Sequence, residues 1–417
     1  MKLLLKVSFL TALLTLLRMG FGFVIAKIVA IYSGPTGLAM MGQIQSFISG
    51  LNGVVNAAAG NAVVRYTAEC GSNGNIEACK PWWVASAQWV AFSISLSIVA
   101  CLIFIDELSL WLFHTSDYNW LLILVICSLP LTAAGTFFSS IINGLRQYKR
   151  FILVSMFAVV VSNGCMIALI HYQKINGALI AASIQAMLVG LIVCLSCLTQ
   201  PWLKLKFFLG AVDAFYLKKI SGYVLMAVTS AVTLPMTIII VRNLIVSHVG
   251  WEGAGNWQAV YKISEVYLSV VTIALSTYYL PALASLVGID AIKKEIGSVT
   301  KVIMPLVVLM AAFIYLTRDF AISVLFTEEF SDARNLFAIQ LSGDVIKILS
   351  WLYAYPMISR GATKWYVGTE IGFAALYVLL ASLLIPIWGV QGAVFAYLTN
   401  YLIYLPFMYF NFNRYAA

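Results

Sequence analysis

Eight charged side chains lie inside apolar stretches of this sequence, and their type and position could do chemistry. These bases and acids are Arg18, Lys27, Arg242, Lys262 and Lys347, with Glu265, Asp344 and Glu370. A charge near the centre of a bilayer costs at least about 2.5–3.5 kcal/mol on insertion scales, so such residues usually face a bundle interior or a wet cavity. With five bases against three acids, a cavity that they line is net basic and suits an anionic substrate.

The basic residues differ in their expected depth. Arg18 lies near the middle of the first apolar stretch and is the strongest single signal. Lys27 and Arg242 lie near the outer ends of their stretches, where long basic side chains can also extend to lipid headgroups. Both explanations stay open from the sequence alone.

Two acid–base pairs have the spacing of neighbours on one helical face. Lys262 precedes Glu265 by three residues, and Asp344 precedes Lys347 by three. Each pair can neutralise itself as an inert ion pair. Alternatively, an acid buried beside a cation can exchange a proton or bind a cation, which makes Glu265, Asp344 and Lys347 candidates for ion coupling. Glu370, close to Lys364, is expected at the membrane surface.

Amide side chains follow one face of the second apolar stretch, at Gln45, Asn52 and Asn56. Amides in membrane helices can hold helices together. They can equally form a hydrogen-bonding wall that faces a hydroxyl-rich substrate, and Tyr261, on the matching stretch of the second half, could join that wall.

The composition shows what must position these residues. Of 417 residues, 62% are hydrophobic and 10% are charged, and the mean hydropathy is +0.96. Soluble chains are about half apolar and about a quarter charged, so a soluble enzyme, a disulfide-framed module and a disordered chain are excluded. The thiols of Cys194 and Cys197 are expected to be packed rather than redox-active.

Twelve apolar stretches are long enough to cross about 30 Å of hydrocarbon as helices. They are approximately 7–31, 36–64, 82–104, 120–142, 151–171, 178–198, 220–246, 257–280, 299–317, 336–358, 366–387 and 389–410. With the N-terminus in the cytoplasm, 17 basic residues fall in cytoplasmic segments and three in outer ones. The positive-inside rule therefore predicts that both termini are cytoplasmic. The net charge of +9 then needs no nucleic acid or other anionic partner.

The stretches repeat after about 215 residues, with the first on the seventh and so on to the sixth on the twelfth. Lys27 precedes Gln43 by sixteen residues, and Arg242 precedes Gln258 by sixteen. The predicted fold is an all-α integral membrane protein, with twelve transmembrane helices in two pseudo-symmetric six-helix lobes, 1–210 and 211–417, around a central cavity. Parallel repeats of this kind are typical of transporters that work by alternating access.

No segment carries the signature of an enzyme. The loops are too short for a catalytic domain, and neither a phosphate-binding G-x-x-x-x-G-K-[ST] nor a metal-ligand spacing occurs. We therefore expect no catalytic residue, no metal and no cofactor, and transport driven by an ion gradient, the membrane potential or the substrate gradient.

Several segments resemble the Wzx flippases of the multidrug/oligosaccharidyl-lipid/polysaccharide exporter (MOP) superfamily, of the O-antigen and enterobacterial common antigen type. They are T-L-L-R-M-G-F-G (Thr15–Gly22), A-K-I-V-A (Ala26–Ala30), S-G-P-T-G-L (Ser33–Leu38), T-L-P-M (Thr233–Met236), W-Q-A-V-Y-K-I-S-E-V-Y-L (Trp257–Leu268), R-D-F-A-I-S-V-L-F (Arg318–Phe326) and F-A-I-Q-L-S-G-D-V-I-K (Phe337–Lys347). The resemblance covers nearly the whole chain.

The resemblance implies a multi-pass protein of the bacterial inner membrane that moves undecaprenyl-pyrophosphate-linked oligosaccharide, such as an O-antigen unit, from the cytoplasmic to the periplasmic leaflet. It implies a cationic cavity with Arg18, Lys27 and Arg242, and an acid at Glu265 with the G-D-V-x-K motif of Asp344 and Lys347. Lys262 departs from the family pattern and could reflect this chain's own sugar unit. Coupling to protons or sodium, and work alongside a polysaccharide polymerase and a chain-length regulator, are further expectations.

Three other functions compete with this one. A cation-coupled drug or small-molecule antiporter of the same superfamily is the main alternative. A membrane polymerase or ligase would need a large outer loop with catalytic groups, which the sequence lacks. A static scaffold does not require a deep Arg18.

Overall fold

The computed structural model describes residues 2–71, 76–208, 210 and 213–416. Every regular element in these ranges is helical. Ten of the described helices are long and apolar enough to cross a membrane. Two of them, Phe9–Val55 and Tyr148–Cys197, each overlap two of the predicted stretches, so all twelve stretches fall on the ten helices. The prediction of an all-α integral membrane protein is confirmed.

The chain forms two compact units. Unit 1 comprises Met1–Tyr32 and Gln43–Met236, and unit 2 comprises Ser33–Gly42 and Thr237–Ala417. Unit 2 therefore takes the short segment Ser33–Gly42 from within the range of unit 1. The predicted lobe boundary between 210 and 211 falls beside residues 209 and 211–212, which lie outside the described residues.

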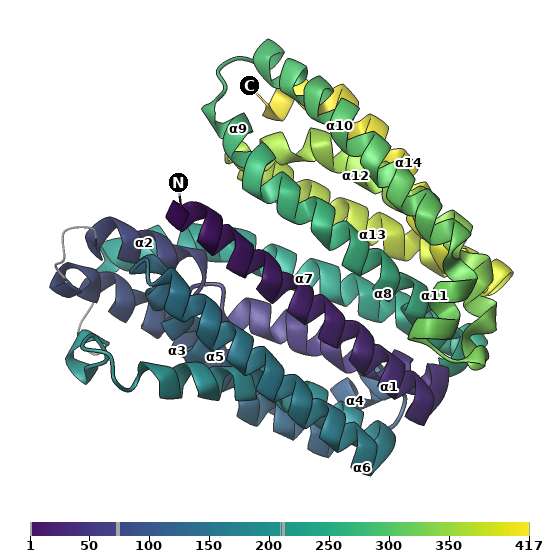
Figure 1. The fold of residues 1–417 in the computed structure, drawn as a ribbon, viewed down its shortest axis with the longest axis horizontal. Helices are drawn as coiled ribbons and strands as arrows, with labels where there is room; N and C mark the ends of the chain where they lie inside the picture. The colour runs from purple at the N-terminus through teal and green to yellow at the C-terminus, as the bar shows by residue number, and fades with distance from the viewer. Residues whose placement is uncertain (1, 72–75, 209, 211–212, 417) are drawn as a thin grey trace. The chain divides into compact units, whose positions relative to one another are not determined.

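Unit 1 holds the first helices of the chain (Figure 1). Its elements are α1 (Lys2–Val55), α2 (Asn61–Gly71), the short 3-10 helix η1 (Ile76–Cys79), α3 (Lys80–Ile103), α4 (Ile105–Phe113), α5 (Asn119–Gly144), α6 (Tyr148–Cys197), the 3-10 turn η2 (Leu205–Phe207) and the first part of α7 (Ala214–Val249). Its core gathers around the fully buried Trp83 and Trp202. Trp83 donates from Nε1 to Thr67 Oγ1 at 2.8 Å, which satisfies the polar atom of a buried ring.

Unit 2 holds the later helices of the chain. Its elements are the last part of α7, α8 (Trp251–Ala274), the π-helical turn η3 (Leu275–Tyr279), α9 (Leu280–Ser285), α10 (Ile289–Leu316), α11 (Arg318–Leu325), the 3-10 segment η4 (Glu328–Leu336), α12 (Phe337–Ser359), α13 (Thr363–Trp388) and α14 (Val390–Tyr415). The short helices α4 and α11 follow long membrane helices in both units, and Asp106 and Asp319 are each the second residue of the short helix.

At four places the chain reverses direction between two membrane helices, each time at a single residue with a positive φ angle. Gly34 (φ 59°) and Lys174 (φ 51°) interrupt the continuous helices α1 and α6, while Gly250 (φ 94°) and Gly389 (φ 56°) separate α7 from α8 and α13 from α14. Glycine adopts this conformation without strain, and three of the four positions use it. The four fall at corresponding places in the repeat, which explains why the sequence spans meet there with almost no loop.

The second predicted stretch is longer than the helix that it forms. Helix α1 ends at Val55, and the predicted end at residue 64 is wrong. The chain turns at Asn56, whose carbonyl accepts from the amide of Gly60 at 3.1 Å, and α2 then begins at Asn61. Hydropathy alone did not show this turn because Ala57, Ala58 and Ala59 continue the apolar run.

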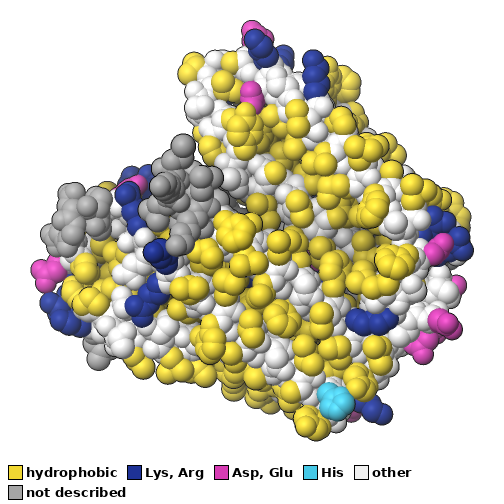
Figure 2. All heavy atoms as spheres, in the orientation of Figure 1, with side chains coloured by type: hydrophobic (Ala, Val, Ile, Leu, Met, Phe, Trp, Pro, Cys, Tyr) yellow, Lys and Arg dark blue, Asp and Glu magenta, His cyan; other side chains and the backbone are white. Residues whose placement is uncertain are grey.

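The outer surface is that of a membrane protein. Large apolar side chains are exposed along the long helices, among them Phe92 and Leu96 on α3 and Leu309 and Phe313 on α10. Figure 2 shows that hydrophobic side chains dominate the visible face. Soluble monomers rarely expose an apolar surface of this extent, so these faces are expected to contact lipid.

Small residues bring two helices of unit 1 into direct contact. A Cβ atom on Gly190 of α6 would collide with the backbone carbonyl of Leu131 on α5, and Gly135 of α5 meets Gly190 in return. Close backbone approach at glycine is the usual way that membrane helices pack.

We expect Gly190→Leu to abolish folded protein, because no shift of a flexible side chain could relieve a clash with backbone. The measurement is the yield of monodisperse protein by size-exclusion chromatography. Gly164→Leu is the matched control, since a Cβ on this glycine, also on α6, meets nothing within 4 Å. Equal yields from the two variants would show that α5 and α6 are not packed as described.

Candidate functional site

Arg242 is the most deeply buried basic residue of the predicted set. It lies on α7 in unit 2, with 1% of its surface exposed. Its Nη2 donates to Gln258 Oε1 at 2.6 Å, and its guanidinium carbon lies 5.6 Å from the centre of the Trp257 ring. Arg242 therefore does not extend to the headgroups but is held inside the unit by an amide and an aromatic face.

Close packing fixes the amide that holds Arg242. A Cβ on Gly42 would lie 2.6–2.9 Å from the side-chain amide atoms of Gln258, so the backbone at Gly42 rests directly on this group. The spacing of sixteen residues between Arg242 and Gln258 thus reflects a contact between α7 and α8.

One face of α8 carries the remaining predicted polar residues of this region. Tyr261 stacks on Trp257 with ring centres 5.4 Å apart. The next residue, Lys262, pairs through Nζ with Glu265 Oε2 at 3.2 Å, and the two side chains are 26% and 54% exposed. The pair thus has the i, i+3 geometry that the spacing allowed, and both side chains are partly exposed.

Asp344 on α12 is fully buried and accepts four hydrogen bonds. Ser264 Oγ and Tyr267 Oη donate to its Oδ2 at 2.7 and 2.8 Å, while Tyr397 Oη and Gln340 Nε2 donate to its Oδ1 at 2.8 and 3.3 Å. Four donors match the four lone-pair positions of an ionised carboxylate. Neutral donors from three helices therefore surround both oxygens of a buried carboxyl group.

Lys347 does not form an ion pair with Asp344 within 4.0 Å in the described structure. Instead its ammonium group faces three rings, those of Trp351 at 4.9 Å, Tyr397 at 5.5 Å and Tyr401 at 5.6 Å. Tyr397 joins the two charges, because its hydroxyl donates to Asp344 and its ring faces Lys347. The direct pair was one of two readings of the spacing, and the structure shows a connected network instead.

The predicted residues of unit 1 are less enclosed. The side chain of Arg18 is exposed on α1 and forms no hydrogen bond or ion pair with a described residue. Lys27, Gln45 and Asn52 are half-buried on the same helix. Asn56 is half-buried in the turn that follows α1, so the predicted amide face ends with Asn52 on the helix itself.

Sequence reasoning missed most of the groups that surround the Asp344–Lys347 network. They are Ser264, Tyr267, Gln340, Trp351, Tyr397 and Tyr401. A signal was present in α14, where Tyr397, Tyr401 and Tyr404 recur at helical spacing. Hydroxyl-bearing rings on one face of a membrane helix indicate a polar partner on a neighbouring helix.

The pair of Lys262 and Glu265 is expected to contribute little to stability. Because both side chains are partly exposed, Lys262→Ala should lower the free energy of unfolding by less than about 0.5 kcal/mol. Thermal unfolding in detergent measures this change. The double variant Lys262→Glu with Glu265→Lys restores the pair and should unfold like the parent chain. A large loss in the single variant would mean that the pair is desolvated.

Solved structures match this helical arrangement over almost the whole chain. A MATE-family multidrug resistance transporter of the MOP superfamily, in its inward-facing conformation, is 15% identical, with 96% of this chain and 98% of that chain covered and a TM-score of 0.73. The chain therefore shares the fold of this transporter. A MOP-superfamily transporter from Pyrococcus furiosus is likewise 15% identical, with 99% and 96% covered and a TM-score of 0.64.

Sequence comparison finds similar proteins that match nearly the whole chain. The chain is 29% identical to the lipid III flippases of Escherichia coli (strain K12) and of Shigella flexneri, over 401 residues that cover 96% of this chain and 95% of each relative. No family model matches the chain. These similar proteins are transporters rather than enzymes.

Proposed function

We propose that this protein is a flippase that moves a lipid-linked oligosaccharide from the cytoplasmic to the periplasmic leaflet of the bacterial inner membrane by alternating access. The carried lipid is undecaprenyl-pyrophosphate with an O-antigen or related repeat unit. Whole-length similarity to lipid III flippases supports this class of substrate. The single structural observation that carries the proposal is the buried Arg242, because charged residues inside membrane-spanning segments usually mark a substrate or ion pathway.

Arg242 suits a pyrophosphate better than a drug-like cation. A guanidinium presents its donors as a planar fork, which matches phosphate oxygens two at a time. Gln258 and Trp257 hold that fork in place before the ligand arrives. Arg18, Lys27 and Lys262 are the further bases that we assign to the anionic head group.

The sugars need neutral hydrogen-bonding groups rather than charges. Gln45, Asn52, Asn56 and Tyr261 are the residues that we assign to this part of the substrate. Amide groups and a phenol can donate to and accept from sugar hydroxyls. None of them selects a particular sugar by itself.

Ion coupling is assigned to the network of unit 2. Asp344 is a buried carboxylate whose donors come from α8, α12 and α14, so its contacts change if these helices move against one another. A proton or a sodium ion on Asp344 would neutralise the charge, and Lys347 would respond through Tyr397. Glu265, more exposed than Asp344, is the second candidate acid.

The orientation and partners follow from the same proposal. With both termini in the cytoplasm, glycosyltransferases supply the substrate on one side, and a polymerase with its chain-length regulator removes it on the other. The two six-helix repeats, 1–210 and 211–417, are the moving parts.

Complementation of a bacterial strain that lacks its own lipid-linked oligosaccharide flippase tests the proposal. We expect expression of this chain to restore surface polysaccharide and to remove the lipid-linked intermediate that mass spectrometry detects in the deficient strain. A change in drug resistance without loss of the intermediate would instead identify a cation-coupled drug antiporter of the same fold.

Arg18→Ala should abolish surface polysaccharide while the protein still inserts. Arg18 has no described partner to lose, so its removal is not expected to unfold the chain. Polysaccharide blots at matched protein levels measure the effect, with Arg65→Ala, which removes an exposed base paired to Glu69, as the control. Full polysaccharide with the Arg18 variant would remove this residue from the substrate site.

A further inference from the structure

An apolar groove lies between α13 and α14 within unit 2, and its lining residues include none of the groups that bond to Asp344. Its volume is about 490 Å³, and its walls include Trp365, Phe373, Ile403 and Phe407. No step of the proposed transport uses it. A cavity of this kind on the outside of a membrane helix pair is a candidate site for a hydrocarbon chain.

Two glycines keep the groove open. Gly368 and Gly372 lie one turn apart on α13 and line the groove, and a Cβ atom on either would meet nothing within 4 Å. The missing side chains are therefore not explained by close packing of two helices. They leave a channel along α13 that side chains of ordinary size would fill.

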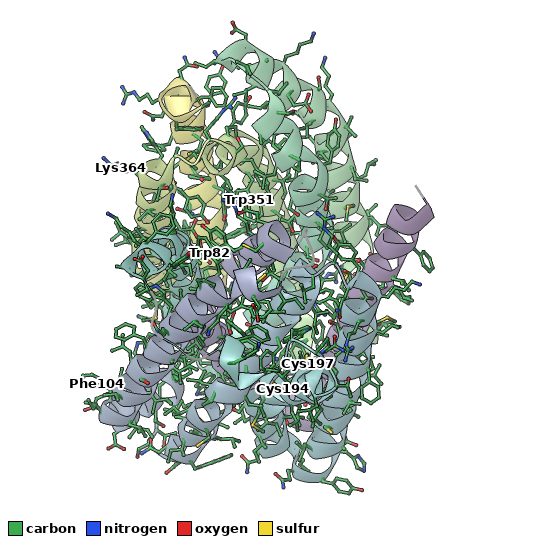
Figure 3. All side chains as sticks on the ribbon, turned by 90° about the vertical axis from the view of Figure 1, so that its left-hand side faces the viewer. Trp82, Phe104, Cys194, Cys197, Trp351 and Lys364 are labelled. Carbon is green, nitrogen blue, oxygen red and sulfur yellow. The ribbon has the colours of Figure 1, made fainter. Side chains whose placement is uncertain are left out.

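The groove has a charged end. Lys364 lines it at the start of α13, is exposed, and forms no hydrogen bond or ion pair with a described residue. In Figure 3 Lys364 projects outward from its helix. Trp365 lies beside it, half-buried in the same wall. A lysine next to a tryptophan at the end of a membrane helix is typical of the headgroup level of a bilayer.

The length of the groove matches one leaflet. Lys364 and Leu376, which also lines the groove, are twelve residues apart on α13. At about 1.5 Å per residue they are roughly 18 Å apart along the helix, close to half of a hydrocarbon core of about 30 Å. A lipid whose head lies at Lys364 can place one acyl chain along the whole groove.

We propose that this groove binds an anionic phospholipid, with its phosphate on Lys364 and one acyl chain over Gly368 and Gly372. The occupant follows from charge complementarity, since the lysine attracts a head group with net negative charge more than a zwitterionic one. The loops that the positive-inside rule places in the cytoplasm include Lys364, so the lipid would come from the cytoplasmic leaflet. The site is separate from the proposed transport function.

Trp365 provides the reporter for a test on the full-length protein in vesicles. Phospholipids with brominated acyl chains quench tryptophan on contact, and the Trp365 signal is the difference between the parent chain and Trp365→Phe. We expect brominated phosphatidylglycerol to quench this signal at a mole fraction about fivefold lower than brominated phosphatidylcholine. Lys364→Gln should remove that preference.

Variants that fill the groove distinguish quenching by a lipid bound there from quenching by the surrounding bilayer. Gly368→Leu should remove the selective quenching, and Gly372→Leu serves if the first variant is unstable. Gly164→Leu, at a glycine of α6 with equally open surroundings, should leave it unchanged. Equal quenching by the two phospholipids, or persistence of quenching in both groove variants, would overturn the proposal. Displacement by undecaprenyl phosphate at lower mole fractions than phosphatidylglycerol would also overturn it and assign the groove to a polyprenyl tail.

Discussion

Arg242→Gln is expected to slow transport of the lipid-linked substrate by about 10- to 100-fold while the protein folds normally. The parent side chain donates to Gln258 Oε1 from a site that is 1% exposed. A glutamine at this position keeps an amide donor without the charge, so we expect the α7–α8 contact to survive. The loss therefore measures the interaction with the anionic head group.

Two further variants make this result specific. Arg242→Lys keeps the charge without the planar fork, and we expect an intermediate rate because a lysine cannot bind two phosphate oxygens in parallel. Arg414→Gln, at an exposed base near the end of α14, should transport at the parent rate. The measurement is the appearance of substrate in the outer leaflet of proteoliposomes. Parent-level transport by Arg242→Gln would refute the assignment of Arg242 to the pyrophosphate.

Asp344→Ala is expected to be the most destabilising of the site substitutions. It removes the acceptor of four buried donors at once, those of Ser264, Tyr267, Gln340 and Tyr397. Leaving a buried donor without a partner costs about 1–3 kcal/mol, so we expect a loss of roughly 3 kcal/mol or more in the free energy of unfolding. Asp290→Ala, at an exposed acid in the first turn of α10, should cost less than about 1 kcal/mol.

Asp344→Asn distinguishes folding from coupling. The amide keeps the shape and one acceptor oxygen, so the variant should unfold closer to the parent than Asp344→Ala does. Because it carries no charge, it should lose the dependence of transport on the ion gradient. Thermal unfolding and transport with and without an imposed proton or sodium gradient report the two effects. Gradient-driven transport by Asp344→Asn would show that the coupling ion binds elsewhere.

The sequence predicted the helices well because their lengths and apolar runs are local properties. The breaks at Gly34 and Lys174 fall between predicted stretches, since polar and small residues interrupt the hydropathy there. The end of α1 was not predictable in the same way. Ala57–Ala59 look like membrane helix by composition, and only the turn at Asn56 ends it.

The site was predicted only in part, because some of its contacts join residues that are far apart in the sequence. Spacing within a helix revealed the Lys262–Glu265 pair and placed Asp344 near Lys347. The groups that hold Asp344 come from positions as far as 80 residues away in the chain, such as Ser264. Tyr397 is 53 residues from Asp344, and no local pattern connects them. Tertiary packing alone shows that a phenol, rather than a direct ion pair, links the two charges.

Single-residue reversals also limit where proteases can cut the chain and where a tag can be inserted. They lie at Gly34, Lys174, Gly250 and Gly389. All four follow odd-numbered passages of the membrane, so they open to the same compartment and leave almost no chain outside the bilayer there. Proteases and antibodies are therefore expected to reach little of the chain at these four reversals. An epitope tag inserted at these positions should break a helix pair, whereas the segment between Phe113 and Asn119 offers a more tolerant insertion point for topology mapping.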